Sequence, residues 1–311
     1  MASLPAVRRL SERVITVLGL NASPFTLQGT NTYIVGTGKT RALIDTGDGV
    51  DGYMDNLVST AAEEGIASLS PVLLSHYHHD HVGGLPGMIE VNREAQEAGN
   101  PPLFDLDAVY KYDPDTLSSP NDLEGAGVIP DGIALKALDS GAEFSVEGAS
   151  LSVLHTPGHT DDSVCFYLAE EDALFSADTV LGSGSTTVFT DLGVYTHSLH
   201  SILGAFPSLG KLYPGHGDVV DNGPALIKQY IEHRAERDLQ ILGVLAESDD
   251  PAGQGLTPLE ITKIVYAAYP PAVLPAAQRG VILHLRKLEG ESRVVPTNRN
   301  DYTAPWILSS L

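Results

Sequence analysis

Four side chains that can bind a metal ion fall within six residues in the first third of the chain. They are His76, His78, Asp80 and His81. Neutral imidazoles and carboxylates suit zinc and the neighbouring divalent transition metals, whereas purely structural zinc sites usually contain cysteine. The chain has a single cysteine. The cluster therefore predicts a catalytic metal site, and the alternative is a chance polar loop.

Further ligands must come from elsewhere, because one short loop cannot complete two coordination spheres. The sequence offers three, each after an apolar run and beside the Gly or Pro residues that let backbone pack close to a metal. They are His159 in the segment TPGHT, Asp178 at the end of LFSAD and His216 in YPGHG. Seven candidate ligands are then available.

Short apolar runs typical of β-strands precede these residues. The run 71–74 leads directly into the first cluster and is typical of a strand that is buried on both faces. Other strands are predicted over residues 14–20, 32–35, 41–44, 133–137, 151–154, 163–168, 173–176 and 211–213. Helices are predicted over residues 51–64 and 196–206. Strand ends would thus hold most of the candidate ligands.

The pattern becomes helical after residue 222. Helices are predicted over 224–247, 257–269 and 272–288, so we divide the chain into a catalytic domain, 1–222, and a helical lobe, 223–311. Residues 101–130 are rich in Asp, Pro, Gly and Ser. They predict a solvated loop inside the first domain, with a lid over the site as the alternative.

Composition narrows the functional classes. With 311 residues and 42% hydrophobic residues, the chain can bury a core and is not a disordered or fibrous protein. The net charge of -22 disfavours general binding to nucleic acid or to anionic membranes. The single Cys165 is expected to be a buried thiol in a reducing compartment, and no apolar run approaches the roughly 18 residues of a membrane helix. These features predict a cytoplasmic protein.

The motif His-x-His-x-Asp-His, followed by single His, Asp and His residues at strand ends, resembles the metallo-β-lactamase superfamily. The resemblance implies an α/β fold, the αββα sandwich, here with a winged-helix-like C-terminal lobe. It also implies two divalent metal ions, with zinc expected and manganese or iron as alternatives. The ligands would then be His76, His78 and His159 for one ion, Asp80, His81 and His216 for the other, and Asp178 as the bridge.

The chemistry that the resemblance implies is hydrolysis. Two cations lower the pKa of a bridging water, so that hydroxide is available near neutral pH, and they polarise the carbonyl under attack. Asp80 is the predicted catalytic side chain, because a carboxylate at this site can orient the hydroxide or carry a proton to the leaving group.

Segments 29–33, 182–189 and 280–285 are similar to a narrower branch of the superfamily. The branch includes β-lactamase-like endoribonucleases and fungal thioesterases that release aromatic polyketides, such as atrochrysone carboxylic acid, from the acyl carrier protein of a polyketide synthase. The resemblance implies a thioesterase of the second kind. The alternatives are a single-stranded endoribonuclease, a glyoxalase II-like thioesterase, a lactonase and a metal-free scaffold. The acidity of residues 1–220 disfavours the nuclease.

The expected partners are an acyl carrier protein and a small-molecule acyl group. Carrier proteins are acidic, so the least acidic part of the chain, the C-terminal lobe, is expected to meet them. The predicted docking residues are Arg279, Arg286 and Lys287 on one helix, with Arg234 and Arg237 as a second pair. The alternative is a solvated face with internal ion pairs.

Other histidines have less specific interpretations. His79 lies inside the motif at its variable position and is expected to face solvent or to support a ligand. His197 and His200 are expected on a helix surface, with a place in the cleft as the alternative.

Overall fold

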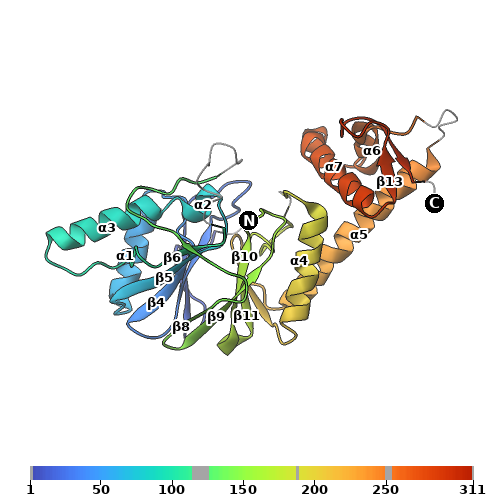
Figure 1. Ribbon diagram of the computed structural model, residues 1–311. Coiled ribbons are helices and arrows are strands. Elements are labelled where there is room, and N and C mark those ends of the chain that lie inside the picture. The colour runs from blue at the N-terminus through green and yellow to red at the C-terminus, as the bar shows by residue number, and fades with distance from the viewer. Residues whose placement is uncertain (1–2, 114–125, 187–188, 249–253, 310–311) are drawn as a thin grey trace.

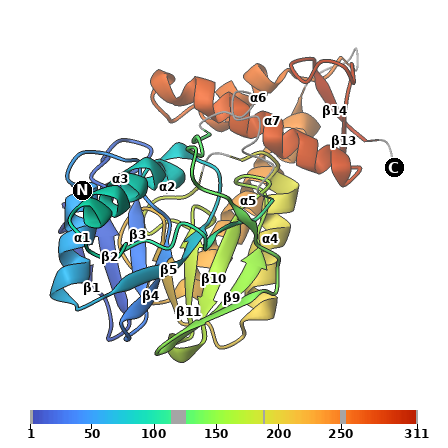
Figure 2. The same ribbon diagram turned by 60° about the vertical axis from the view of Figure 1, so that its left-hand side comes forward.

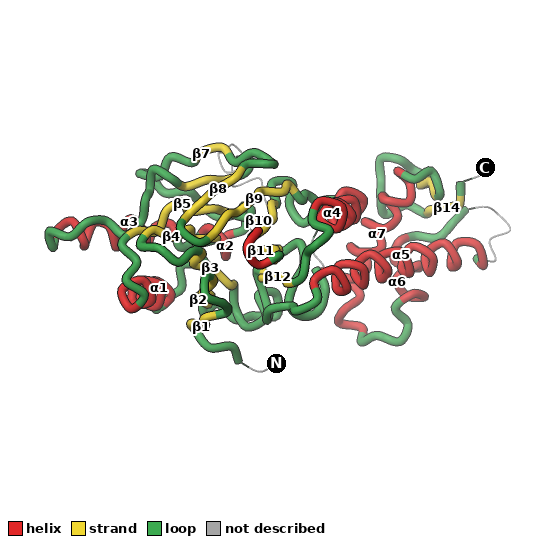
Figure 3. The backbone as a smooth tube through the Cα atoms, turned by 90° about the horizontal axis from the view of Figure 1, so that it is seen from below, coloured by secondary structure: helices red, strands yellow, loops and turns green. Residues whose placement is uncertain are grey.

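Two β-sheets pack face to face, and helices cover the outer face of each (Figure 1). The computed structural model describes residues 3–113, 126–186, 189–248 and 254–309. Seen along the strands, the two sheets form adjacent layers, with α1 on one side and α4 on the other (Figure 3). This arrangement is the αββα sandwich, so the predicted fold class is confirmed.

The first sheet has seven strands that follow one another in chain order. They are β1 (Val7–Arg9), β2 (Val14–Leu18), β3 (Asn31–Val35), β4 (Thr40–Ile44), β5 (Ser68–Leu74), β6 (Val109–Lys111) and β7 (Lys136–Ala137). Strands β1 to β4 are antiparallel, and β4 to β7 are parallel. The ends of β4 and β5 therefore meet at one edge of the sheet.

The second sheet has five strands in the order β12-β11-β10-β9-β8. Their bounds are β8 (Glu143–Val146), β9 (Ala149–His155), β10 (Val164–Leu168), β11 (Ala173–Ala177) and β12 (Lys211–Pro214), and the short helix η3 (Ala169–Glu171) joins β10 to β11. Strands β11 and β12 are parallel, so Asp178 and His216 follow neighbouring strand ends.

Side chains alternate between the two faces of the central strands, so that each strand contributes to two cores. In β2 all five side chains are buried because they face two different cores. Ile15 and Val17 pack against the helix layer, whereas Val14 packs between the two sheets. Phe166 and Phe175 meet that inner core from the second sheet. The predicted strands 14–20, 32–35, 41–44, 71–74, 151–154, 163–168, 173–176 and 211–213 are confirmed within a few residues at their ends.

Helices α1 (Tyr53–Glu63), α2 (His79–Val82) and α3 (Leu85–Glu97) belong to the first half of the sandwich, and α4 (Leu192–Ala205) covers the second sheet. The prediction for α4 began four residues too late, because Asp191 caps the helix by accepting a hydrogen bond from the Val194 N–H at 2.9 Å. Helix α3 was not predicted.

One strand prediction and one loop prediction were wrong in part. The strand predicted over 133–137 is reduced to β7, because only Lys136 and Ala137 find partners, on the short strand β6. The predicted loop 101–130 contains β6 itself, and Phe104 in the same stretch is buried against the first core. Residues 114–125, and with them the lid alternative, lie outside the described residues.

The C-terminal lobe contains α5 (Gly223–Glu247), α6 (Pro258–Val265), the short helix η4 (Pro271–Val273), α7 (Leu274–Gly290) and the hairpin β13 (Val294–Pro296) with β14 (Trp306–Leu308). The hairpin was not predicted, and Trp306 anchors it in a core of its own. Helix α7 lies above the end of the sandwich (Figure 2) and packs against α4 and α5. Within the described ranges, no helix combines the length and apolar character needed to span a bilayer.

Candidate metal centre

The seven predicted ligands converge at one end of the sandwich, and the structure brings all of them together. They lie in the segments that follow β5, β9, β11 and β12. Ligand atoms of His76, His78, His159 and Asp178 lie within 4.8 Å of one another, and so do those of a second group, Asp80, His81 and His216. The end of a buried strand is a rigid position, which explains how residues 140 positions apart in the chain (76 and 216) reach one site.

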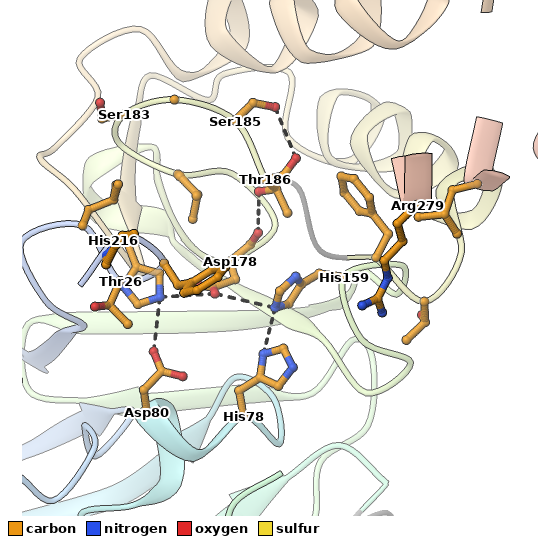
Figure 4. Close-up of a pocket in the computed structure, with 18 of the residues that line it drawn as sticks. Thr26, His78, Asp80, His159, Asp178, Ser183, Ser185, Thr186, His216 and Arg279 are labelled. Carbon is orange, nitrogen blue, oxygen red and sulfur yellow. Dashed lines mark hydrogen bonds and ion pairs between the residues drawn. The ribbon is translucent and has the colours of Figure 1, made fainter. Parts of the chain in front are cut away.

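Imidazoles dominate the first group. His78 Nδ1 lies 2.9 Å from His76 Nε2. It also lies 3.0 Å from His159 Nε2, and His159 Nε2 lies 3.6 Å from Asp178 Oδ2 (Figure 4). His76 and His159 are buried. Three ring nitrogens therefore point at a common place beside one carboxylate.

Asp178 also reaches the second group. Its Oδ1 lies 3.4 Å from His81 Nε2, and its Oδ2 lies 3.3 Å from His216 Nε2. Within that group, Asp80 Oδ2 lies 3.3 Å from His216 Nε2 and 3.5 Å from His81 Nε2. Asp178 is therefore placed between the groups, where a bridging ligand would stand.

Two observations show that these residues fit two divalent ions. His81 Nε2 and Asp178 Oδ1 are buried and have no hydrogen-bond partner among the described residues, which is costly unless a ligand satisfies them. The second observation is that backbone packs closely against these ligands. A Cβ on Gly215 would lie 2.4 Å from Asp178 Oδ1 and 3.0 Å from His81 Cε1, so only glycine fits there. The nitrogen and oxygen donors suit zinc, manganese or iron.

Burial already favours the metal-binding form of two imidazoles. It lowers the pKa of His76 well below its ordinary value, an effect strengthened by neighbouring His81, and lowers the pKa of His78 to about 3, with His159 adding to it. A neutral ring nitrogen is the form that binds a metal. These two ligands therefore release no proton when a metal binds at neutral pH.

In the second group, neighbouring carboxylates outweigh the effect of burial on the pKa of an imidazole. Burial alone would lower the pKa of His216, but Asp178 and Asp80 outweigh it and raise the pKa to about 9. Burial would raise the pKa of Asp178, yet His216 and His81 hold it well below its usual range. Both features indicate a strongly negative site that suits a cation.

Asp45 supports the site and was missed from the sequence. It is 2% exposed, accepts hydrogen bonds from the Ser75 N–H at 2.7 Å and the Ser75 hydroxyl at 2.8 Å, and lies 2.7 Å from His81 Nδ1. A carboxylate on one ring nitrogen fixes the tautomer and turns the other nitrogen toward the metal. The sequence shows that Asp45 follows the predicted strand 41–44, but only the parallel pairing of β4 with β5 brings it beside His81.

Substituting Asp45→Asn is expected to weaken metal binding by about 10- to 100-fold, because His81 loses the group that orients it. Competition against a chromophoric chelator measures this affinity. The matched control is Asp55→Asn, which neutralises an exposed carboxylate in the first turn of α1. Equal metal affinities for the two variants would contradict a role for Asp45 in orienting His81.

Asp80 is held by a second hydrogen-bond network. The Thr30 hydroxyl donates to Asp80 Oδ2 at 2.7 Å, and the Asn21 amide donates to Thr30 Oγ1 at 3.0 Å and to Asp48 Oδ2 at 3.2 Å. The catalytic role assigned to Asp80 stays a prediction, but its carboxylate is fixed in place beside the imidazoles.

The remaining histidines lie outside both groups. His79 is largely exposed, and its Nε2 lies 3.0 Å from Asp48 Oδ1. His197 and His200 are exposed on α4, as expected, and line a small pocket away from the metal groups. Cys165 is buried as expected; burial raises the pKa of its thiol to about 11, although Thr156 and Thr179 oppose the rise.

A cleft of about 950 Å³ opens above the two groups. Its floor includes His78, Asp80, His159, Asp178 and His216. Its walls include Phe25, Leu27, Tyr77, Phe189, Ile282 and Leu283. The last two belong to α7, so the C-terminal lobe forms part of the cleft.

The predicted docking residues are only partly exposed. Arg234 and Arg237 are buried, so the prediction that they form a basic surface pair was wrong. Arg234 donates to the Thr186 carbonyl at 2.6 Å, and Arg237 stacks on Tyr266 at 4.2 Å. Both arginines sit on the helix face that packs inward.

The remaining three predicted docking residues divide between two environments. Lys287 donates to Asp238 and to Glu291, each at 2.6 Å, and faces the small pocket beside α4. Arg279 and Arg286 instead line the cleft above the metal groups.

Several proteins of animals and fungi are similar to this chain in sequence. A "Beta-lactamase-like protein 2 homolog" of Drosophila melanogaster is 40% identical over 299 residues, 94% of each chain. "Lactamase-like protein aptB" of Emericella nidulans is 40% identical over 86% of this chain and 77% of its own. "Atrochrysone carboxyl ACP thioesterase AgnL7" of Paecilomyces divaricatus is 38% identical over 85% of this chain and 74% of its own.

Solved structures share the fold over nearly the whole chain. A beta-lactamase domain protein from Burkholderia ambifaria has a TM-score of 0.73 at 17% identity, covering 99% of this chain and 96% of its own. A metallo-beta-lactamase family protein from Thermus thermophilus has a TM-score of 0.68 at 19% identity, covering 96% of this chain and 100% of its own.

Two family patterns match separate parts of the chain. Residues 25–216 match the metallo-beta-lactamase superfamily, and residues 257–303 match the beta-lactamase associated winged helix domain. Helix α5 lies between the two matches, so the predicted boundary at residues 222 and 223 stays a prediction. The chain belongs to the metallo-β-lactamase superfamily, as a metal-dependent hydrolase with a C-terminal winged-helix domain.

Proposed function

We propose that the protein hydrolyses the thioester that joins an aromatic polyketide acid to the acyl carrier protein of a polyketide synthase. The observation that carries the proposal is the cleft, which places apolar walls above a floor of metal-binding side chains. Such a cleft suits an acyl group whose rings lie along the walls and whose thioester carbonyl reaches the floor.

Phe25 supports an apolar substrate. It lines the cleft from the segment between β2 and β3, yet it is 80% exposed. Phe189 lines the cleft from the second half of the sandwich and is buried. Aromatic side chains stack on aromatic ligands with a gain beyond the area they bury. An exposed phenylalanine at a substrate cleft is therefore placed to cover a ring system.

Divalent ions bound by the two groups would supply Lewis acidity toward the thioester carbonyl and a water nucleophile near neutral pH. The chain's own residues position the reaction. Thr30 fixes the Asp80 carboxylate at the floor of the cleft, where it can orient that water and accept its proton. The thiolate of the carrier arm is a good leaving group, so no strongly acidic side chain is needed beside the sulfur.

A relative supports the substrate class. The Paecilomyces divaricatus protein, 38% identical over 85% of this chain, bears the name of an acyl carrier protein thioesterase. The net charge of -22 also opposes broad contact with a nucleic-acid backbone.

A single-stranded endoribonuclease is the second candidate. The observation that favours it is the pair Arg279 and Arg286 in the wall of the cleft, since guanidinium groups bind phosphate oxygens.

The test compares both substrates with metal-loaded protein. One reaction contains an aromatic polyketide thioester on its carrier protein, and the other contains single-stranded RNA. We expect free acid and carrier thiol to appear while the RNA stays intact. Cleavage of the RNA with an intact thioester would overturn the proposal in favour of the nuclease.

Substituting Phe25→Ala is expected to lower kcat/KM about tenfold for an aromatic acyl thioester, because a ring contact of about 1.4 kcal/mol is lost. Steady-state thiol release measures the change, with Leu239→Ala as the control, since Leu239 is 63% exposed on α5 outside the cleft. A similar loss on an acetyl thioester would show that Phe25 supports the site rather than the rings.

A further inference from the structure

One face of helix α7 forms a continuous strip in the cleft wall. Arg279, Ile282, Leu283 and Arg286 all line the cleft, at positions i, i+3, i+4 and i+7 of the helix. This spacing places them on a single face, with the two arginines about 10 Å apart along the axis. The strip is apolar in its middle and cationic at both ends.

The strip lies over the metal groups. Helix α7 packs against α4 and α5 and crosses above the end of the sandwich (Figure 2). In the close-up, Arg279 extends from the helix on the side of the pocket where His159 lies (Figure 4). The arginines and the metal-binding side chains therefore line one cleft, and a single ligand can contact both.

Most arginines of this acidic chain are neutralised by carboxylates. Ion pairs join Arg8 to Asp218, Arg9 and Arg41 to Glu64, Arg13 to Glu171, Arg93 to Glu90 and Glu97, and Arg293 to Glu291. Arg286 is exposed and, in the part of the chain that the structure describes, has no such pair. In a chain with 40 acidic and 18 basic residues, a cleft-lining arginine without a carboxylate points to an anionic ligand.

Tyr302 orients Arg286 without using its hydrogen-bond donors. The guanidinium carbon lies 4.5 Å from the centre of the Tyr302 ring. A guanidinium that stacks through its face keeps its N–H groups at the edge, where they can bind the oxygens of a phosphate in pairs. The stacking thus prepares Arg286 for a planar, charge-assisted contact.

We propose that Arg279 and Arg286 form an anion subsite that binds the phosphate of the phosphopantetheine arm of a carrier-bound substrate. The inference rests on the proposed thioesterase function. The arm carries its phosphate at the carrier end and its thioester at the other end. A phosphate bound at α7 and a thioester carbonyl bound at the floor of the cleft would therefore match the two ends of the arm. Ile282 and Leu283 then contact the part of the arm that lies between its phosphate and its thioester.

The test uses metal-loaded, full-length protein and two soluble thioesters of one acyl group, on phosphopantetheine and on pantetheine without phosphate. We expect the wild-type protein to prefer the phosphorylated thioester about 10- to 100-fold in kcat/KM. The variant R279Q/R286Q should reduce this preference to about one. Arg293→Gln is the matched control, because it removes an exposed arginine of the same lobe outside the cleft, and should keep the preference.

Two results of the kinetic test would overturn the subsite. One is a wild-type preference near one, and the other is a preference that survives in R279Q/R286Q. If no thioester is hydrolysed, the proposed function fails, and calorimetry with 4′-phosphopantetheine judges the subsite separately. Binding that is lost in R279Q/R286Q supports it. If 4′-phosphopantetheine does not bind, the proposed subsite is overturned. The same holds if the arginines bind single-stranded RNA but not 4′-phosphopantetheine.

Discussion

Replacing Asp178 with asparagine is expected to lower kcat/KM by at least about a thousandfold. Among the described residues, Asp178 alone has a carboxylate that contacts imidazoles of both groups, His159 in the first and His81 and His216 in the second. Asparagine keeps the shape but removes the charge and turns an N–H toward ring nitrogens. Loss of several kcal/mol of transition-state stabilisation corresponds to this factor. Thiol release from an acyl thioester measures kcat/KM, and metal analysis of the same sample measures bound metal.

Asp139→Asn is the control for this substitution, because it removes one exposed carboxylate from the loop before β8. We expect its metal content and rate to match those of the wild-type protein. An Asp178→Asn variant that retained two metal equivalents and most of the activity would contradict the role of Asp178 as the bridge.

Replacing Lys111 with methionine is expected to lower the free energy of unfolding by about 3–5 kcal/mol, because it leaves a buried carboxylate without its partner. Lys111 is 0% exposed, ends β6 and forms an ion pair with Asp162, which is 1% exposed. Its ammonium also donates to the carbonyls of Tyr112 and Asp113, at 2.9 and 3.3 Å. Urea denaturation measures the change.

Two variants separate charge from packing in this prediction. Lys39→Met removes an exposed lysine and should change the free energy of unfolding by less than about 0.5 kcal/mol. Adding Asp162→Asn to Lys111→Met should recover part of the loss, because burial itself raises the pKa of Asp162 and only Lys111 and hydrogen bonds offset that penalty. No recovery in the double variant would show that packing alone carries the effect.

This ion pair lies close to the proposed metal centre. Asp162 accepts a hydrogen bond from the Thr160 hydroxyl at 2.7 Å, and Thr160 directly follows His159. Lys111 belongs to the first sheet and Asp162 to the β9–β10 segment of the second. The pair therefore ties the two sheets together beside one of the ligands.

The seven candidate ligands could be selected from the sequence because they follow buried strands, and the structure brings them together. Apolar runs such as 71–74 identify strands without tertiary information, and the dense spacing of His76, His78 and His81 gave the site a strong local signal. His159 and His216 were found for the same reason, since each follows a strand and a Pro-Gly turn.

Features that depend on tertiary contacts were predicted less well. Asp45 gains its role only because β4 is the parallel neighbour of β5, which no local pattern reveals. Strand β7 begins three residues later than predicted, because β6, its partner among the described residues, is short. Arg234 and Arg237 carry the charge of surface residues, but the packing of α5 buries them against Thr186 and Tyr266.

A metal titration of protein stripped with a chelator tests most directly whether the seven ligands hold two catalytic ions. Zinc is added in steps, while bound metal and thiol release from an aromatic acyl thioester are followed in the same samples. A hydrolase with two metal ions should be inactive when stripped, and its activity should rise and saturate at two bound ions per chain. Full activity in the stripped protein, or saturation of two sites without any thioester hydrolysis, would contradict this expectation.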